Sequence, residues 1–181
     1  MKYLIFIFTL LSIISCSTTT GDRISQLQRS PGTKMDDGII SRAIVKSIKN
    51  QKLDKTNNIS VSTYNAVVLF TGEVADENTK QKITKIAQDV YQVRKVIDKT
   101  KISAPSSLTS RSGDSFTTTQ IRAKILGNPI ANKPDIEIIT EDGEVYLMGI
   151  VTKKEKQHIL HIVKTTSGVQ KIIAIFEVVD L

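Results

Sequence analysis

Two histidines, His158 and His161, come closest to a metal-binding pattern in this chain. They lie three positions apart on a segment with helical periodicity, a spacing that can bring two imidazoles to one Zn²⁺ ion. The apolar positions Ile159, Ile162 and Val163 set the core face of that segment, so both histidines lie on its flank or outer side. No carboxylate stands at a spacing that completes a site. We therefore expect no metal and no other cofactor.

The patterns that carry catalysis are also missing. The sequence shows no nucleophile beside an evident general base and no glycine-rich loop that could hold a phosphate. Gly72 and Gly149 each follow an apolar, valine-containing run, where glycine more often serves strand geometry than chemistry. We therefore expect a protein that is not an enzyme and has no catalytic residues.

The single cysteine, Cys16, suggests a different chemistry. It ends an apolar run that begins after Lys2, which is the pattern of a signal peptide too short for a permanent membrane anchor. Its context, Ile-Ile-Ser-Cys, resembles a bacterial lipobox, in which the cysteine becomes the lipidated first residue of the mature chain. We predict that residues 1–15 are removed and that Cys16 is acylated, with palmitate among its acyl chains. The alternative is an ordinary secreted protein with a spare thiol.

The residue after the cysteine indicates a location. In lipoproteins of this kind aspartate at that position favours the inner membrane, and this chain has Ser17, which predicts the bacterial outer membrane with the chain facing the periplasm. Several acyl chains anchor a protein firmly. The mature chain keeps 24 Lys and Arg against 18 Asp and Glu, a balance that suits an anionic membrane surface or nucleic acid. Export excludes nucleic acid as a partner.

An internal repeat organises the mature chain. Residues 39–74 match residues 116–151 without a gap, at an offset of 77, and each contains two apolar-alternating runs around a turn. Each copy follows the order helix, strand, strand, helix, strand over about 65 residues, near the lower size for an independent core. A repeat of this size predicts two copies of one small domain.

The predicted fold class is α+β, with two tandem αββαβ domains. Each has two helices on one face of a small mixed three-stranded sheet, whose other face is either open or packed against the other copy. Asp36 and Asp37 are expected to cap the first helix, and a third strand is expected from about residue 93 to 102. The expected segments are a signal peptide 1–15, a lipidated flexible tether 16–36, domains 37–103 and 115–181, and a linker 104–114.

The second copy's GEVYLMGIVT and SGVQKI, in this order of elements, resemble the BON domain, and the resemblance covers about residues 37–179. The first copy departs from the pattern, with Asn65-Ala66 where a glycine often sits and Tyr91-Gln92 in place of a glycine before Val93. Two copies behind a lipobox, with GDR soon after the cysteine, look like dual-BON outer-membrane lipoproteins of the DolP (YraP) type. The resemblance implies a non-enzymatic protein that binds anionic phospholipids and supports outer-membrane integrity.

The first helices of the two copies differ on their outer faces. In the first copy this face is cationic, which is typical of a solvated surface; it carries Arg42, Lys46 and Lys49. In the second copy it is mostly apolar with a cation on either flank; the residues are Phe116, Thr119, Ala123 and Leu126, flanked by Arg122 and Lys124.

An apolar helix face edged by Lys and Arg is how a helix meets an anionic membrane surface. These six residues are therefore the candidate lipid-binding site. The face could instead pack against the other copy or a loop, a choice that the sequence leaves open and the family resemblance moves toward lipid. For the whole protein, the alternative is an adaptor that binds outer-membrane assembly proteins without direct lipid recognition. An envelope hydrolase is disfavoured by the missing catalytic residues.

Overall fold

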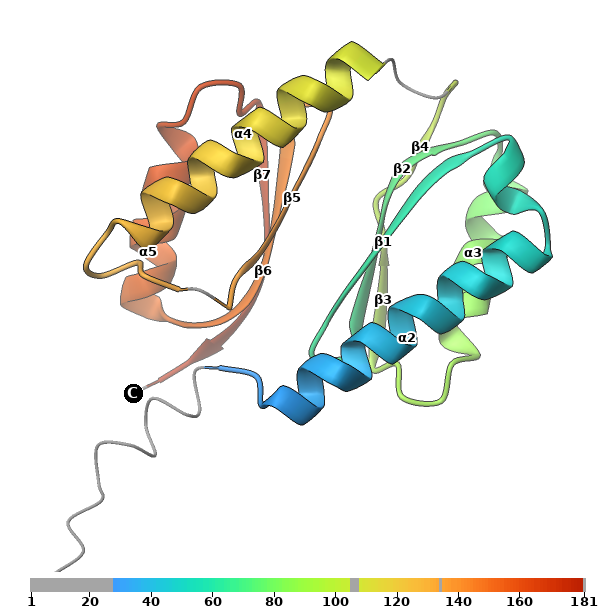
Figure 1. The fold of residues 1–181 in the computed structure, drawn as a ribbon, viewed down its shortest axis with the longest axis horizontal. Helices are drawn as coiled ribbons and strands as arrows, with labels where there is room; N and C mark the ends of the chain where they lie inside the picture. Colours follow the sequence, from blue (N-terminus) through green and yellow to red (C-terminus); the bar gives the residue numbers. More distant parts are fainter. Residues whose placement is uncertain (1–27, 105–107, 134, 181) are drawn as a thin grey trace, which may run out of the picture.

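Two copies of one αββαβ unit follow each other along the chain (Figure 1). The structure is a computed structural model that describes residues 28–104, 108–133 and 135–180. The first unit comprises α2 (Pro31–Asn50), the 3-10 helix η1 (Leu53–Lys55), β1 (Asn58–Tyr64), β2 (Val67–Val74), α3 (Glu77–Gln88), β3 (Lys95–Asp98) and β4 (Lys101–Ile102). The second comprises α4 (Leu108–Leu126), β5 (Glu137–Glu141), β6 (Glu144–Thr152), α5 (Lys153–Lys164) and β7 (Lys171–Val179).

Each unit has a small mixed sheet with its second strand in the centre. β1 pairs antiparallel with β2, which pairs in parallel with β3 and β4; β5, β6 and β7 repeat the arrangement. The predicted α+β fold class is therefore confirmed. One predicted strand is broken into β3 and β4, because the Asp98 carboxylate accepts hydrogen bonds from Thr100 N at 2.8 Å and Thr100 Oγ1 at 2.7 Å and turns the chain.

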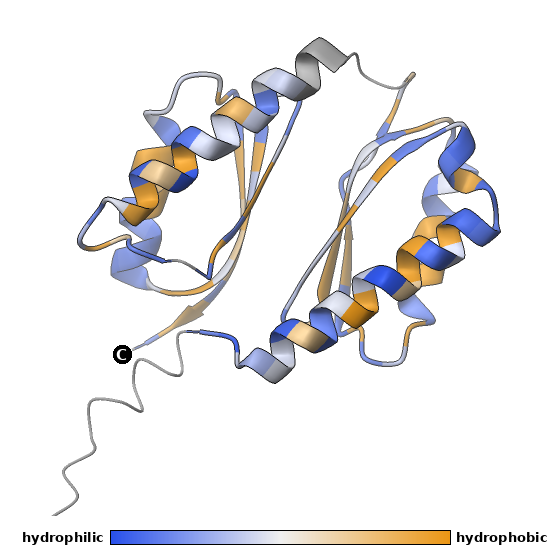
Figure 2. Cartoon of the chain, viewed as in Figure 1, coloured by the Kyte–Doolittle hydropathy of each residue, from blue (hydrophilic) through white to orange (hydrophobic). Residues whose placement is uncertain are grey.

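The helices bury one apolar stripe each against one face of their sheet. Ile40, Ile44 and Ile48 of α2 are buried, and so are Ile121 and Ile125 of α4, as the helical spacing predicts. Figure 2 shows hydrophobic and hydrophilic residues alternating from turn to turn along the helices, as this spacing requires. The orientation of α4 is thereby fixed, with its opposite side turned outward.

The prediction that Asp36 and Asp37 cap the first helix is wrong. α2 begins at Pro31, where Ser30 Oγ accepts a hydrogen bond from Thr33 N at 3.1 Å and proline occupies the first position. The helix therefore includes residues 31–36, which the sequence reading gave to the tether. α4 likewise begins at Leu108, inside the segment expected to be a linker.

The buried carboxylate of Asp37 binds the hairpin turn instead. It accepts hydrogen bonds at 2.8 Å from the backbone N–H groups of Asn65 and Ala66, both of which have positive φ. In the second unit Asp114 accepts from Asp142 N at 2.7 Å and Gly143 N at 3.0 Å. Each aspartate thus fastens the first helix of its unit to the turn between the first two strands, where left-handed residues suit a type I′ hairpin.

The two sheets turn their remaining faces toward each other. The sequence left open whether this face is exposed, and the structure shows that the two copies pack together. The buried centre of the interface consists of Tyr64, Leu69, Tyr146 and Met148. The resulting order is helices, sheet, sheet, helices (Figure 1), so that α2 over β1 and α4 over β5 lie in opposite outer layers, both nearer the viewer than α3 and α5.

Candidate functional site

The outer side of α4 carries an exposed stripe, called here the α4 outer stripe: Phe116, Thr119, Ala123 and Leu126. Phe116 exposes 66% and Leu126 43% of its surface, while Ile121 and Ile125 on the opposite side are fully buried. A rise of 1.5 Å per residue separates Phe116 from Leu126 by about 15 Å along the helix axis. The stripe is therefore an elongated, shallow apolar surface that points away from the protein.

Two cations flank the α4 outer stripe. Arg122 Nη1 donates to the carbonyl oxygen of Ile136 at 3.5 Å, and Lys124 Nζ donates to Thr166 Oγ1 at 3.1 Å. Both side chains thus lean back over opposite sides of the helix. Among the residues that the structure describes, neither has a carboxylate within the 4.0 Å of an ion pair. The exposed Lys124, and to a smaller extent the half-buried Arg122, can therefore turn toward an external anion.

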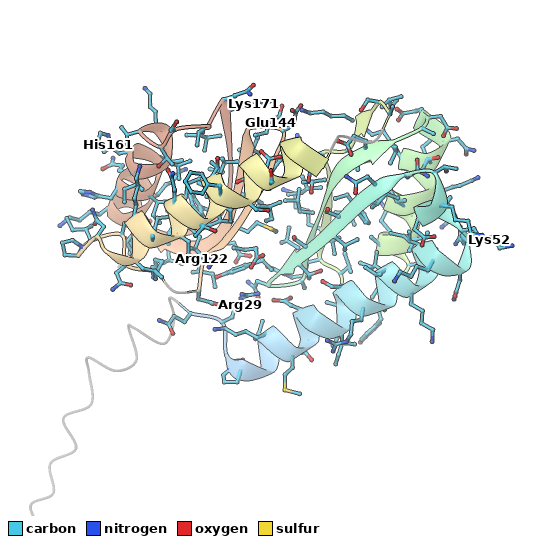
Figure 3. The ribbon with its side chains drawn as sticks, turned by 45° about the horizontal axis from the view of Figure 1, so that its top comes forward. Arg29, Lys52, Arg122, Glu144, His161 and Lys171 are labelled. Carbon is cyan, nitrogen blue, oxygen red and sulfur yellow. The ribbon has the colours of Figure 1, made fainter. Side chains whose placement is uncertain are left out.

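The positive charge of Arg122 acts on the carboxylate of Glu137 on β5. Burial raises the pKa of Glu137, and the positive charges of Arg122 and Arg29 oppose this rise without cancelling it. Both arginines lie toward the same end of the molecule in Figure 3. Arg122 therefore partly compensates the charge of a half-buried carboxylate, which limits how far the Arg122 charge is available to a ligand.

The interface between the domains does not cover the α4 outer stripe. It is formed by the two sheet faces, whereas the stripe lies on the side of α4 opposite its own sheet. Packing against the other copy, the alternative for this face, is not what the structure shows. The six predicted residues instead lie together on one exposed surface, with Arg122 half-buried.

A cluster around Arg29 joins the segment just before α2 to both domains, and the sequence analysis did not predict it. Arg29 Nη1 binds Asp37 Oδ2 at 2.7 Å, and Arg29 Nη2 binds Asp135 Oδ1 at 3.0 Å. Its guanidinium carbon lies 3.7 Å from the centre of the Tyr64 ring. The exposed fractions of these side chains are 11% for Arg29, 4% for Asp37 and 6% for Asp135. We call this cluster the Arg29 clamp.

The hydroxyl of Tyr64 extends the Arg29 clamp across the interface. It donates to Asp135 Oδ2 at 3.4 Å and accepts from Ile150 N at 3.3 Å, both in the second domain. Burial, with the nearby Asp135 charge, raises the pKa of Tyr64 to about 12. Tyr64 therefore stays protonated and keeps donating at any physiological pH.

Further ion pairs join the two domains at β4 and just before β3 of the first unit. Lys101 Nζ lies 3.1 Å from Asp142 Oδ2 and 3.6 Å from Glu144 Oε1 of the second domain. Within the second domain, Lys171 Nζ lies 3.3 Å from the same glutamate oxygen (Figure 3). Just before β3, Arg94 pairs with Glu177. These contacts and the apolar interface fix α2 and α4 relative to each other.

The remaining predicted sites lie elsewhere. His158 and His161 are on α5, and no three His, Cys, Asp or Glu side chains of the described ranges cluster closely enough to hold a metal ion. Cys16 lies outside the described residues. Within residues 28–104, 108–133 and 135–180, no helix has the length and hydropathy needed to span a membrane.

The internal repeat contained a signal for the contacts of Asp37 and Asp114, but not for those of Arg29. Asp37 and Asp114 differ by the repeat offset of 77, as do the turn residues they bind, so extending the repeat by two residues would have paired them. Arg29 and Asp135 are 106 residues apart and belong to no repeated pattern. Their contact could not be read from spacing.

Known proteins support the repeat-based assignment. The BON domain family model matches residues 36–104 and again residues 113–180. The chain is 29% identical over 153 residues to the outer membrane lipoprotein DolP of Haemophilus influenzae, covering 84% of this chain and 79% of that protein. It is 26% identical to the 21 kDa hemolysin of Actinobacillus pleuropneumoniae, with the same coverage.

A further relative is the osmotically-inducible protein Y of Escherichia coli, which is 27% identical over 157 residues, covering 85% of this chain and 78% of that protein. The two family matches together span most of the chain, and the relatives align over nearly all of it. The chain therefore belongs to the BON domain family and, with its two BON domains, is similar to the DolP type.

Proposed function

We propose that this protein is a lipid-anchored, non-enzymatic lipoprotein of the bacterial outer membrane, facing the periplasm. In this proposal it binds anionic phospholipid through the second BON domain and supports outer-membrane integrity. The observation that carries the proposal is the exposure of Phe116 and Leu126, at 66% and 43%, on a helix whose opposite side is fully buried. Large exposed apolar side chains gathered on one face indicate an interaction surface.

The energetics suit a surface that works beside an anchor. Apolar burial contributes about 25 cal/mol per Å², so half-burying Phe116 and Leu126 gives a few kcal/mol at most. Arg122 and Lys124 each add on the order of 1 kcal/mol near an anionic surface. Neither contribution alone gives tight binding. Acylated Cys16 would hold the domain at the membrane and raise its effective concentration there.

The test is binding to vesicles by the mature chain with Cys16→Ser, which removes the anchor and leaves the folded surfaces. The wild-type surface should bind vesicles of phosphatidylglycerol, bind phosphatidylcholine poorly, and weaken with salt because exposed charges are screened. Phe116→Asp should abolish binding without unfolding the chain. Tyr91→Asp is the matched control, since Tyr91 is 98% exposed and lies on the first domain.

Equal binding by the Phe116→Asp and Tyr91→Asp variants would refute the proposed lipid site. If Phe116→Asp instead abolished a salt-resistant cross-link to an outer-membrane assembly protein and left vesicle binding intact, the α4 outer stripe would be a protein-interaction surface and the adaptor function would replace lipid recognition.

A further inference from the structure

The outer side of α2 carries a second stripe, called here the α2 outer stripe: Met35, Ile39, Arg42, Lys46 and Lys49. The intervals of four and three residues place all five on one side of the helix, opposite the buried Ile40, Ile44 and Ile48. Met35 is 67% and Ile39 51% exposed. The helix thus presents an apolar pair in its first turns and three cations after it, where the sequence suggested only a solvated cationic face.

The three cations are free to act together. Among the described residues, Arg42, Lys46 and Lys49 form no ion pair, whereas Lys34 on the same helix is engaged with Asp135 at 2.9 Å. The Arg42 guanidinium reaches back over Gly38, since a Cβ built there would lie 3.2 Å from Arg42 Nη1. Its charge is thereby brought toward the apolar end of the stripe.

A shallow hollow accompanies these cations on the helix surface. It is lined by Ser41, Arg42, Val45, Lys46, Lys49 and Asn50. The Lys and Arg stems and Val45 give it apolar walls, and the charged ends form its rim. An apolar hollow rimmed by three unpaired cations is complementary to an anionic head group attached to a hydrocarbon chain.

The position of α2 selects a membrane as the partner. Arg29 follows Cys16 by thirteen positions, and a chain of that length reaches at most about 45 Å. The first turn of α2 therefore stays close to any acylated Cys16, and Met35 and Ile39 lie at that end of the stripe. The Arg29 clamp holds this end of α2 against the second domain, although α2 and α4 themselves lie in opposite outer layers (Figure 1).

We propose that the α2 outer stripe is a second membrane-binding surface, at which Met35 and Ile39 enter the head-group boundary while Arg42, Lys46 and Lys49 bind lipid phosphates. The first BON domain then has a bilayer contact of its own, in addition to that of α4 in the second. This inference rests on the proposed function only in taking an anionic bilayer as the ligand. It assigns charge recognition mainly to α2 and apolar insertion mainly to α4.

Single-cysteine labelling tests where the bilayer lies, because Cys16→Ser removes the only cysteine of the chain. An environment-sensitive dye is attached at Ile39→Cys, Phe116→Cys or Tyr91→Cys in the mature chain and mixed with phosphatidylglycerol vesicles that contain a lipid-borne quencher. We expect blue-shifted, quenchable emission at positions 39 and 116 and no change at position 91. A response at 116 without one at 39 overturns this inference and leaves the proposed function standing. A response at position 39 without one at position 116 refutes the proposed lipid site on α4 and leaves this inference standing.

A second experiment removes the three charges of the α2 outer stripe. The triple variant Arg42→Gln, Lys46→Gln, Lys49→Gln should weaken binding to phosphatidylglycerol vesicles by about 100-fold, because each surface cation contributes roughly fivefold. The matched control is Lys82→Gln, Lys95→Gln, Lys99→Gln, which removes the same charge from exposed positions on α3, in β3 and just after β3. Circular dichroism checks that both variants fold. Equal losses in the two triples would show that only net charge matters and would overturn the inference.

Discussion

Replacing Arg29 by methionine tests whether the Arg29 clamp stabilises the arrangement of the two domains. Methionine keeps an apolar stem over the Tyr64 ring and removes the charge that lies between Asp37 and Asp135. Both carboxylates are almost completely buried, so the substitution leaves two buried anions with one partner fewer. Removing one member of a buried ion pair typically costs about 3–5 kcal/mol.

The lower end of that range applies here. Asp135 keeps Lys34 at 2.9 Å, and Asp37 keeps two backbone N–H donors at 2.8 Å. We therefore expect Arg29→Met to lower the free energy of unfolding by about 3 kcal/mol and the melting temperature by roughly 6–12 °C. Arg94→Met is the matched control, because its pair with Glu177 is about half exposed and should be worth less than about 1 kcal/mol.

The pH dependence sharpens the test. Burial raises the pKa of Asp135, but hydrogen bonds from Arg29 and Lys34 outweigh this effect and hold the pKa below its usual value. A carboxylate with a depressed pKa contributes stability above its unfolded-state pKa and loses it as the pH falls through the folded-state value. The Arg29→Met penalty should therefore be full at pH 7 and shrink below about pH 4. Urea unfolding at several pH values measures it, and a penalty that is independent of pH, or no larger than that of Arg94→Met, would refute the reasoning.

Three further changes have definite expected outcomes. Gly72→Ala should lower the free energy of unfolding by at least about 2 kcal/mol, because the residue has φ +100° and a Cβ would lie 2.0 Å from Asn58 O. The control Gly149→Ala, whose Cβ would make ordinary contacts at 3.5 Å, should change it by at most about 1 kcal/mol. Thermal melts of both variants measure the difference. Glu137→Gln should stabilise the folded protein at pH 7 and lose this gain in acid. The reason is that burial raises the pKa of Glu137, so the wild-type folded state loses stability as the pH rises toward and through that pKa. Unfolding curves that show no gain in stability at pH 7 would contradict this prediction. Cys16→Ala should release the protein from the membrane fraction or stall its processing, and intact-mass measurement of the wild type should show acylation with residues 1–15 absent; an unmodified chain that begins at Met1 would exclude lipidation.

The repeat and the helical spacing were enough to predict the fold. Hydrophobic periodicity placed Ile44 and Ile121 in separate cores, and the offset of 77 residues transferred the topology from one copy to the other. These features depend on contacts within a unit, which repeat with the sequence. The same logic identified the α4 outer stripe, because a side chain opposite a buried stripe must face outward.

Contacts between the units could be predicted only in part. The runs 67–70 and 145–148 are apolar on both faces of their strands, which favours burial on both sides and could have indicated that the sheets pack together. The start of α2 was also marked, by Ser30 before Pro31, but within a polar stretch that resembled a tether. The Arg29 clamp has no local pattern, because its partners meet only once the domains have docked.

The central claim is that α4 meets the anionic bilayer, and paramagnetic broadening in nuclear magnetic resonance tests it most directly. The isotope-labelled mature chain with Cys16→Ser is mixed with nanodiscs of phosphatidylglycerol that carry a spin-labelled lipid. The account predicts strong broadening of the amide signals of residues 115–127, and little broadening with phosphatidylcholine nanodiscs. Unaffected α4 signals beside broadened α3 or α5 signals would contradict it.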